Sequence, residues 1–488
     1  MLVICSHMIY PYKDDYKNLA AEYDIVPVYR EFLADMETPV SVLKRFSQKS
    51  NVFLLESMEG GEKWGRYSFL GVDPEMLFEV DHSAGRTGGL EQLRSVYKGL
   101  KVAMLPGLPR FFGGAVGYIG YEAMSEFEKM PQPKKNKTQC RSRFLKADKL
   151  IVFDNVRHTI KIVICTRPSS SQDAGALYDA AVSQIEAIAQ EMHQPVSSVS
   201  SVSQDKIDFT SNMTRPDFVK MIEKAKKYIY DGDIIQAVLS QRFSVKADID
   251  SVELYRALRL LNPSPYTFYM KIGEEALVGS SPEVMVRLTG NKVELRPIAG
   301  TRRRGATEQE DGTLADELLV DEKEKAEHVM LVDLGRNDIG RIAESGSVQV
   351  TDYMVIERYS HVMHMVSHVQ GILKNEYDAY DVIKATFPAG TLSGAPKIRA
   401  MQIIHELEPD PRGVYGGAVG YISYGGNMDL AITIRTLEVR EGEISVQAGA
   451  GVVFDSVPEK EYEETCQKAR GMKKAVEMAA SGLEIKDY

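Results

Sequence analysis

The 488-residue sequence has few cysteines and no long apolar run. Its four cysteines, Cys5, Cys140, Cys165 and Cys466, lie far apart and form no C-x-x-C pattern. This usage argues against a disulfide framework and is typical of a reducing compartment, so we expect a cytoplasmic protein. No stretch approaches the roughly 18 to 20 apolar residues of a membrane span, and we expect no membrane partner.

The sequence also lacks an excess of positive charge, because 59 Lys and Arg residues face 69 Asp and Glu residues and leave a net charge of −10. An acidic chain binds a phosphate backbone poorly, so we expect no nucleic-acid partner, and any anionic ligand must meet local positive charge. Common motifs are absent as well. The chain has no P-loop, H-E-x-x-H or G-x-S-x-G, which argues against the usual nucleotide-binding, zinc-protease and hydrolase classes.

Composition divides the chain into four parts. Residues 1–23 form an N-terminal extension of unknown role, and residues 24–165 mix short β-like runs with a helical stretch. Residues 166–213 combine a helical segment with a Ser-rich linker, clearest at 194–203, and residues 214–488 form a larger second region. Regular strand–helix alternation is missing, so we predict an α+β fold in which helices cover antiparallel sheets.

One heptapeptide, G-G-A-V-G-Y-I, occurs at Gly113–Ile119 and again at Gly416–Ile422. Glycine permits close backbone approach, and the alternating Val, Tyr and Ile favour a strand. We therefore predict that the two copies form equivalent strands, one from each region. Coincidence of two glycine-rich strands is the alternative.

Paired carboxylates lie on two helical segments. Glu324 and Glu327 share one face of a long helix predicted over 314–334, and Glu461 and Glu464 share a face near the C-terminus. Carboxylate oxygens from two helices suit Mg²⁺, which takes one or two carboxylates together with water and an anionic substrate. A charged helix face is also commonly just solvated, so both interpretations stay open.

Other segments carry candidate anion-binding groups. Thr391–Lys397 has the hydroxyl, glycine and proline of a helix entrance whose N–H groups attract an anion, although ordinary helix starts look similar. Gln447–Val452 is a small-residue strand whose backbone can lie against a ligand, and Arg435 interrupts an apolar strand. His361 and His364 fall on opposite faces of a strand-like segment, which favours one working histidine over a zinc site.

Four motifs in the expected order resemble the chorismate-utilising enzymes, and most closely the large subunits of the anthranilate synthases. The motifs are Pro297–Thr301, Asp333–Asp338, Gly390–Lys397 and Gln447–Gly451. The dense match runs from about residue 214 to 471. The resemblance implies antiparallel β-sheets packed as a sandwich, covered by helices, with the two regions of the chain intertwined.

The resemblance also assigns roles by position. It implies that Glu327 and Glu464 are Mg²⁺ ligands, with Glu324 and Glu461 as supporting acids. It makes Glu283 the general acid that protonates the departing 4-hydroxyl of chorismate, and such an acid needs a raised pKa. His364 would lie near the pyruvyl end. The remaining matches hold the substrate carboxylates and the ring: Thr301, Thr391, Tyr415, Arg435, Gly449, Gly451 and Lys468.

A second site is implied by two further segments. Leu54–Ser57 and Asn262–Tyr266 resemble the segments that form a tryptophan feedback site in that family. The expected tryptophan-binding residues are Leu55, Glu56, Ser57, Pro265, Tyr266 and Thr267.

Two positions distinguish the branches of the family. Water-adding members have a lysine in place of Gln236, and aminodeoxychorismate synthases have one in place of Ala299. The amide and methyl groups here imply that ammonia attacks C2 of chorismate, giving anthranilate and pyruvate in a Mg²⁺-dependent carbon-oxygen lyase reaction of tryptophan biosynthesis. Arg303 departs from the expected proline, which leaves the shape of that loop open.

The chain has no G-x-C-x-G glutaminase nucleophile. The resemblance therefore implies a hetero-oligomer with a glutamine amidotransferase subunit (component II) that supplies the ammonia. Two alternatives remain: an aminodeoxychorismate synthase component I, and a non-catalytic subunit that binds chorismate or tryptophan.

Overall fold

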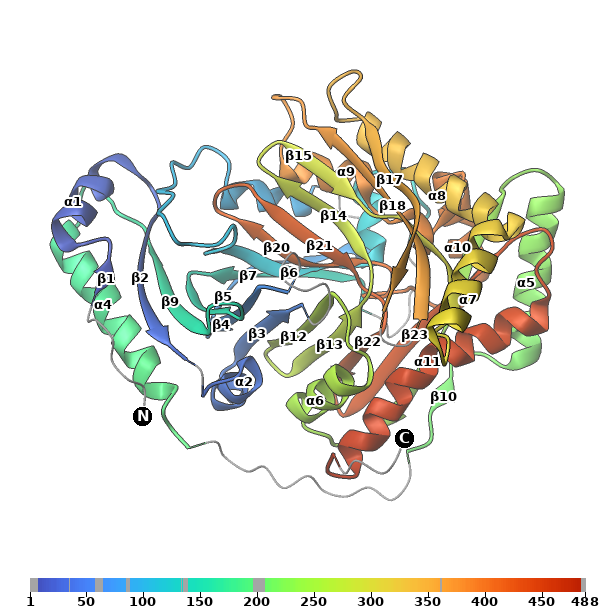
Figure 1. Cartoon of the computed structure of the whole chain (residues 1–488), viewed down its shortest axis with the longest axis horizontal. Helices are drawn as coiled ribbons and strands as arrows, with labels where there is room; N and C mark the ends of the chain where they lie inside the picture. The colour runs from blue at the N-terminus through green and yellow to red at the C-terminus, as the bar shows by residue number, and fades with distance from the viewer. Residues whose placement is uncertain are drawn as a thin grey trace.

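Two antiparallel sheets form the centre of the molecule (Figure 1). The structure is a computed structural model, and it describes residues 8–34, 36–57, 65–84, 88–132, 134, 139–195, 207–359 and 362–483. Over these residues the first sheet has 13 strands and the second has 10.

The strands of the first sheet alternate in direction along its whole width. In spatial order they are β1 (Ile9–Tyr10), β2 (Val26–Leu33), β9 (Thr159–Thr166), β8 (Lys149–Asp154), β4 (Tyr67–Val72), β3 (Asn51–Glu56), β12 (Tyr266–Ile272), β13 (Glu275–Ser281), β22 (Thr436–Arg440), β23 (Glu443–Val452), β11 (Gln236–Lys246) and β10 (Thr210–Ser211), with β19 (Gly394–Ala395) also paired to β11.

The second sheet is built in the same way. Its order is β16 (Ile298–Arg303), β18 (Val362–Ile372), β15 (Lys292–Leu295), β14 (Val284–Thr289), β21 (Met428–Ile432), β20 (Ala418–Ser423), β6 (Gly114–Ile119), β7 (Arg141–Ala147) and β5 (Glu75–Asp81), with β17 (Gln349–Arg358) beside β18.

Helices cover the outer faces of both sheets (Figure 1). On the first sheet lie α1 (Lys13–Glu22), α2 (Pro39–Phe46), α4 (Ala174–Glu191), α6 (Ser251–Leu261) and α11 (Pro458–Ala480). On the second lie α7 (Glu308–Val320), α8 (Glu322–Gly340) and α9 (Ala379–Thr386). Beside β11 lie α5 (Arg215–Tyr230) and α10 (Lys397–Leu407). Short 3₁₀ turns are η1 (His82–Ala84), η2 (Leu90–Val96), η3 (Tyr121–Glu126) and η4 (Gly390–Leu392).

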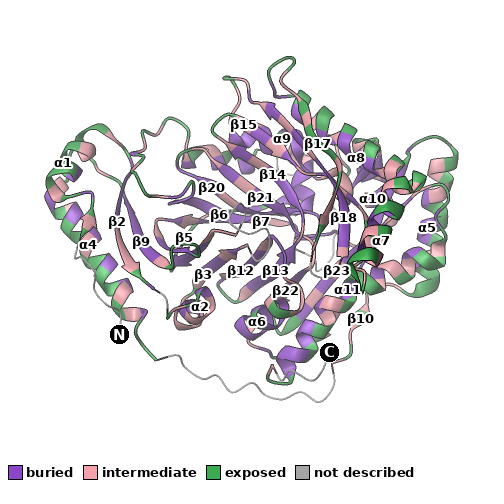
Figure 2. Cartoon of the chain, viewed as in Figure 1, coloured by how far each residue is buried: buried purple, intermediate pink, exposed green. Residues whose placement is uncertain are grey.

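The core lies between the sheets and under the helices. One apolar cluster combines Phe53 and Phe268 of the first sheet with Val116 and Val286 of the second. A second cluster fills the space between the first sheet and its covering helices. Figure 2 shows buried residues along the strands and exposed residues on the outer surfaces of the helices. The predicted α+β sandwich of antiparallel sheets covered by helices is therefore confirmed.

The two regions of the chain share both sheets. In the first sheet β3 pairs with β12, so that Glu56 is opposite Thr267. In the second sheet β6 pairs with β20, so that Gly117 is opposite Gly420. The two copies of the repeated heptapeptide are thus neighbouring strands of one sheet, which confirms both the strand prediction and the intertwined arrangement.

Two local expectations are wrong. The helix predicted over 314–334 is two helices, because Asp321 leaves the helical conformation and its side chain accepts hydrogen bonds from the backbone N–H groups of Lys323 and Glu324. Arg435 does not interrupt a strand. It lies in the turn between β21 and β22, with a positive φ of 48°.

Residues 8–23 pair and pack with the rest of the first sheet, since β1 pairs with β2 and α1 contacts α4. The four-part division of the chain stays a prediction. Most of the Ser-rich segment lies outside the described residues, as does His361. Among the helices in the described ranges, none combines the length and apolar character that a membrane crossing requires.

Close packing of β6, the N-terminal strand at the junction, against its other neighbour β7 depends on glycine. A Cβ atom at Gly117 would lie 2.0 Å from the backbone carbonyl oxygen of Arg143 on β7. We predict that Gly117→Ala lowers the free energy of unfolding by about 1–3 kcal/mol, because the strands must separate to admit the methyl group. Gly312→Ala on α7 is the control, since no atom lies within 4 Å of the added Cβ. It should be neutral or stabilising by up to about 1 kcal/mol. Equal stability of Gly117→Ala and the parent in urea denaturation would contradict the prediction.

Candidate active site

The sequence-predicted residues gather where β23 and β11 of the first sheet approach β16 and β18 of the second. Glu283 occupies the centre of this arrangement, in the connection by which the chain leaves β13 of the first sheet and enters β14 of the second. Its backbone carbonyl accepts a hydrogen bond from the N–H of Ile432, which fixes the connection to β21.

Glu283 is buried, with 9% of the residue's surface exposed. Burial raises its pKa from the ordinary value of 4.5 to about 7, and the hydrogen bond from Thr391 and the charges of Lys468 and Arg435 only partly oppose this effect. The hydroxyl of Thr391 donates to Glu283 Oε1 at 2.9 Å. A carboxyl that keeps its proton near neutral pH meets the requirement for a general acid.

His364 lies on β18 directly opposite Thr301 of β16. Its Nδ1 atom is 3.0 Å from the carbonyl oxygen of Gly300 and 3.1 Å from Thr301 Oγ1. Burial lowers the pKa of His364, and the nearby charge of Arg435 lowers it further, so the ring is neutral at pH 7. Because a carbonyl oxygen can only accept, Nδ1 carries the proton and Nε2 is left as a base.

Two glycines of β23 leave the strand without side chains on the face toward the site. A Cβ atom at Gly449 would lie 2.7 Å from the hydroxyl oxygen of Tyr415. A Cβ atom at Gly451 would lie 2.6 Å from Gln236 Nε2 and 3.8 Å from Glu327 Oε1. Tyr415, Gln236 and Glu327 therefore converge on one stretch of backbone, and only glycine leaves room for them there.

The carboxylates of α11 and α8 form two pairs. On α11, burial raises the pKa of Glu461, and the charge of Glu464 raises it further. On α8, burial and the charge of Glu327 both raise the pKa of Glu324. The charge of Lys323 on α8 partly opposes the rise in the pKa of Glu461 on α11, so the two helices lie near each other.

Each pair also reaches β23. Lys468 donates to the carbonyl of Gly449 at 3.0 Å and lies 2.8 Å from Glu464. Gln236 Nε2 donates to Glu327 Oε1 at 3.1 Å. The predicted metal ligands from two helices thus flank the same two glycines.

This donor set fits an open magnesium site. Within the described part of the chain no three His, Cys, Asp or Glu side chains converge as in a closed metal cage. The buried Oε1 atom of Gln236 has no hydrogen-bond partner, and within each pair the carboxylates repel each other. A hard divalent cation that keeps several waters would relieve that repulsion while taking few protein ligands.

Arg435 supplies positive charge to both candidate catalytic groups. Its charge acts on the pKa of Glu283 and on that of His364, so the guanidinium lies near both. Its carbonyl oxygen accepts a hydrogen bond from the N–H of Ser280 at the end of β13. The turn, rather than a strand, aims this side chain into the site.

The loop that carries Thr391 is fixed to α8. Lys397 Nζ lies 2.7 Å from Asp338 Oδ2, and this largely buried ion pair joins two of the sequence motifs. A Cβ atom at Gly390 would lie 2.8 Å from Leu334 of α8, so glycine permits the close approach. The sequence showed both motifs but not this contact between them.

A separate cavity of about 310 Å³ lies between β3, β12, β14 and β21. All six predicted tryptophan-binding residues line it: Leu55, Glu56, Ser57, Pro265, Tyr266 and Thr267. Sequence reasoning missed other parts of its wall. Tyr266 donates to Asp429 at 2.9 Å, Arg287 pairs with the same carboxylate at 2.6 Å, and Phe111 stacks on Tyr421 at 4.3 Å. Asp429, Arg287, Phe111 and Tyr421 lie outside the two predicted segments and have no local signature.

Glu283 is expected to make stability depend on pH. Its carboxyl holds a proton more tightly in the folded chain than in the unfolded one, so its favourable contribution is complete below about pH 4.5 and is lost as the pH rises through about 7. We predict that Glu283→Gln gains about 3 kcal/mol over the parent chain between about pH 4 and pH 8. Denaturant unfolding at both pH values measures the difference. Glu463→Gln, at an exposed position, is the control and should show no such gain. A pH-independent difference for Glu283→Gln would contradict the buried, protonated state.

Comparison with known proteins agrees with this geometry. The chain matches the chorismate binding enzyme family over residues 50–474. It is 47% identical to anthranilate synthase component 1 of Acetivibrio thermocellus, across 97% of this chain and 99% of that protein. It is 45% identical to the protein of the same name from Aquifex aeolicus, across 96% and 98%.

Solved structures show the same fold. Anthranilate synthase component I from Streptococcus pneumoniae superposes with a TM-score of 0.75 at 39% identity, covering 85% of this chain and 95% of that one. The menaquinone-specific isochorismate synthase of Escherichia coli, at 19% identity and a TM-score of 0.72 over 95% and 98% of the two chains, shares the fold. The chain described here belongs to the chorismate binding enzyme family and groups within it with the anthranilate synthase component 1 proteins.

Proposed function

We propose that the chain is a Mg²⁺-dependent carbon-oxygen lyase that converts chorismate and ammonia to anthranilate and pyruvate. The observation that carries the proposal is the buried Glu283 carboxyl, which keeps its proton near neutral pH and faces Thr391, Lys468 and Arg435. The relatives named anthranilate synthase component 1 support the same reaction.

Binding must overcome the repulsion between a doubly negative substrate and an acidic protein. Arg435 and Lys468 supply local positive charge, and Thr301 and Tyr415 supply hydroxyl groups. The bare backbone at Gly449 and Gly451 lets the substrate approach the first sheet. Bound Mg²⁺, held by Glu327 and Glu464 with Glu324 and Glu461 in support, would neutralise a substrate carboxylate.

The first chemical step is loss of the 4-hydroxyl as water. Glu283 donates its proton to that oxygen as the C4–O bond breaks, and ammonia forms a bond to C2. Thr391 holds the carboxyl in place through the 2.9 Å hydrogen bond. The product of this step is aminodeoxyisochorismate.

The side chains around the nucleophile favour ammonia over water. Gln236 presents an amide with a buried, unpaired Oε1, which can accept an N–H but cannot act as a strong base. Ala299, buried on β16, offers no amine that could attack C2 itself. Pyruvate is then eliminated, and the free Nε2 of His364 can accept a proton in that step.

By the same resemblance we propose that a glutamine amidotransferase subunit supplies the ammonia in a cytoplasmic hetero-oligomer, and that tryptophan inhibits the enzyme. The aromatic wall of the 310 Å³ cavity, with Phe111 stacked on Tyr421, suits an indole ring.

Product analysis tests the reaction. The purified chain is incubated with chorismate, ammonium and Mg²⁺, and the product is followed by fluorescence and chromatography. Formation of the fluorescent ortho-aminobenzoate with an equal amount of pyruvate is expected. A product aminated at C4, formed without pyruvate, would indicate aminodeoxychorismate synthase. Binding of chorismate without turnover would indicate a regulatory subunit.

The metal ligands give a sharper prediction. Glu327→Gln and Glu464→Gln should each lower Mg²⁺-dependent turnover by at least about a hundredfold with folding retained, since each removes one carboxylate charge from the divalent cation. Glu463→Gln, on the exposed side of the same helix, is the matched control and should keep full activity. Normal activity and normal Mg²⁺ dependence in both variants would exclude this ligand assignment.

The regulatory cavity is tested at Ser57. We predict that Ser57→Ala weakens tryptophan inhibition by about tenfold or more with little change in the uninhibited rate, because it removes a hydroxyl from the wall of the cavity. Ser183→Ala on the exposed side of α4 is the control. Unchanged inhibition in Ser57→Ala would mean that tryptophan acts elsewhere.

A further inference from the structure

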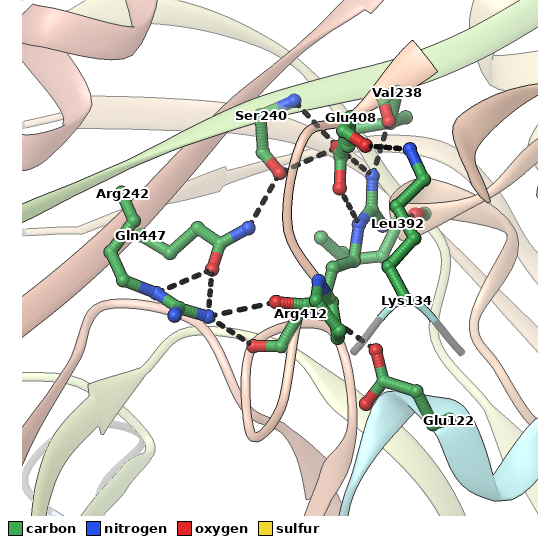
Figure 3. Close-up of polar contacts among 10 residues, drawn as sticks. Glu122, Lys134, Val238, Ser240, Arg242, Leu392, Glu408, Arg412 and Gln447 are labelled. Carbon is green, nitrogen blue, oxygen red and sulfur yellow. Dashed lines mark hydrogen bonds and ion pairs between the residues drawn. The ribbon is translucent and has the colours of Figure 1, made fainter. Parts of the chain in front are cut away.

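Arg412 is the centre of a buried polar network beside the candidate active site (Figure 3). It lies in the loop between α10 and β20, and only 1% of its surface is exposed. Its guanidinium donates to both carboxylate oxygens of Glu408, at 2.7 and 2.9 Å. This bidentate pair balances the buried charge and fixes the plane of the guanidinium.

The remaining donors of Arg412 hold two segments of backbone. Nη1 donates to the carbonyl of Leu392 at 2.7 Å, and Nη2 donates to the carbonyl of Val238 at 2.6 Å. Leu392 directly follows Thr391, the residue that donates to Glu283. Val238 lies on β11, two residues from Gln236. One side chain thus fixes two sides of the site relative to each other.

The network itself is held from several directions. Ser240 of β11 donates to Glu408 through its N–H and its hydroxyl, at 2.8 and 2.7 Å. Glu122, on η3 of the N-terminal region, accepts the backbone N–H groups of Arg412 and Gly413 at 2.7 and 3.1 Å. Figure 3 shows these groups meeting around Arg412 from separate elements. Arg412 therefore has little freedom to move.

We propose that Arg412 is a positioning residue for the proton donation by Glu283, because it holds the Leu392 carbonyl and thereby keeps the Thr391 hydroxyl against the Glu283 carboxyl. The inference rests on the proposed function. It assigns to a residue that touches no reacting atom the task of keeping the general acid in place.

Thr391 provides the reference for the test. Its hydrogen bond favours the charged form of Glu283. The two charged groups that also act on this carboxyl, Lys468 and Arg435, are unaffected by a change at Thr391. In Thr391→Val the pKa of Glu283 should rise, so the limb on which kcat falls with increasing pH should move to higher pH.

Arg412→Lys keeps the charge beside Glu408 but cannot reach both carbonyls. We expect it to lower kcat for anthranilate formation by at least about tenfold, with a smaller change in KM. The limb on which kcat falls with increasing pH should also shift to higher pH. The double variant Arg412→Lys/Thr391→Val should show no further shift. Arg143→Lys is the matched control, since Arg143 is also buried and pairs with Glu79 and Glu275 away from the site. It should leave the limb in place.

The outcomes separate this inference from the proposed function. If the parent chain makes no anthranilate, the proposed function fails, and a crystal structure of Arg412→Lys still decides whether the Thr391–Glu283 contact depends on Arg412. An intact contact in that structure, or a variant with lowered thermal stability and an unmoved pH limb, overturns the inference. Arg412→Gln is measured in parallel, and failure of both variants to fold would show a purely structural role and overturn it as well.

Discussion

Pairing of strands from the two regions of the chain is the constraint on which both sites depend. Because β3 lies beside β12, segments more than 200 residues apart form one wall of the 310 Å³ cavity. Because β6 lies beside β20, the second sheet continues from β14 and β21, which flank the Glu283 connection, into strands of the N-terminal region. Backbone hydrogen bonds fix the register of these strand pairs, because a shift of one residue would turn every side chain of the strand to the other face of the sheet.

Glu283 shows how the fold trades stability for chemistry. A carboxyl placed in solvent would be ionised at neutral pH and useless as an acid, whereas burial between the two sheets keeps it protonated at a cost that appears as the pH rises. Under the proposed function, the opposing requirement is attraction of a doubly negative substrate. Arg435 and Lys468 would supply it, and their charges oppose the burial effect on the pKa of Glu283 only in part. Under the proposed function, the paired glutamates of α8 and α11 would provide oxygen ligands for a divalent cation.

Local patterns predicted much of the fold, and motif order supplied the residues of the candidate site. Apolar periodicity gave helices such as α5, and the shared heptapeptide gave two strands that prove to be neighbours. Patterns failed where one residue changed the path of the chain, as at Asp321, whose extended backbone ends α7 and whose side chain caps the start of α8. They also could not reveal Arg412 or Asp429. Apart from Glu408, the partners of Arg412 come from distant segments, as does Tyr266, the partner of Asp429, and only the folded chain brings them together.

The protonation state of Glu283 is the most direct test. Infrared spectra of the parent chain and of Glu283→Gln are recorded across the pH range, and their difference isolates the C=O stretch of one protonated carboxyl. The band is expected to persist in mildly acidic solution and to disappear around pH 7, the pKa of the buried group. Disappearance of the band near pH 4.5, the ordinary value for a glutamate, would contradict the assignment of Glu283 as the general acid.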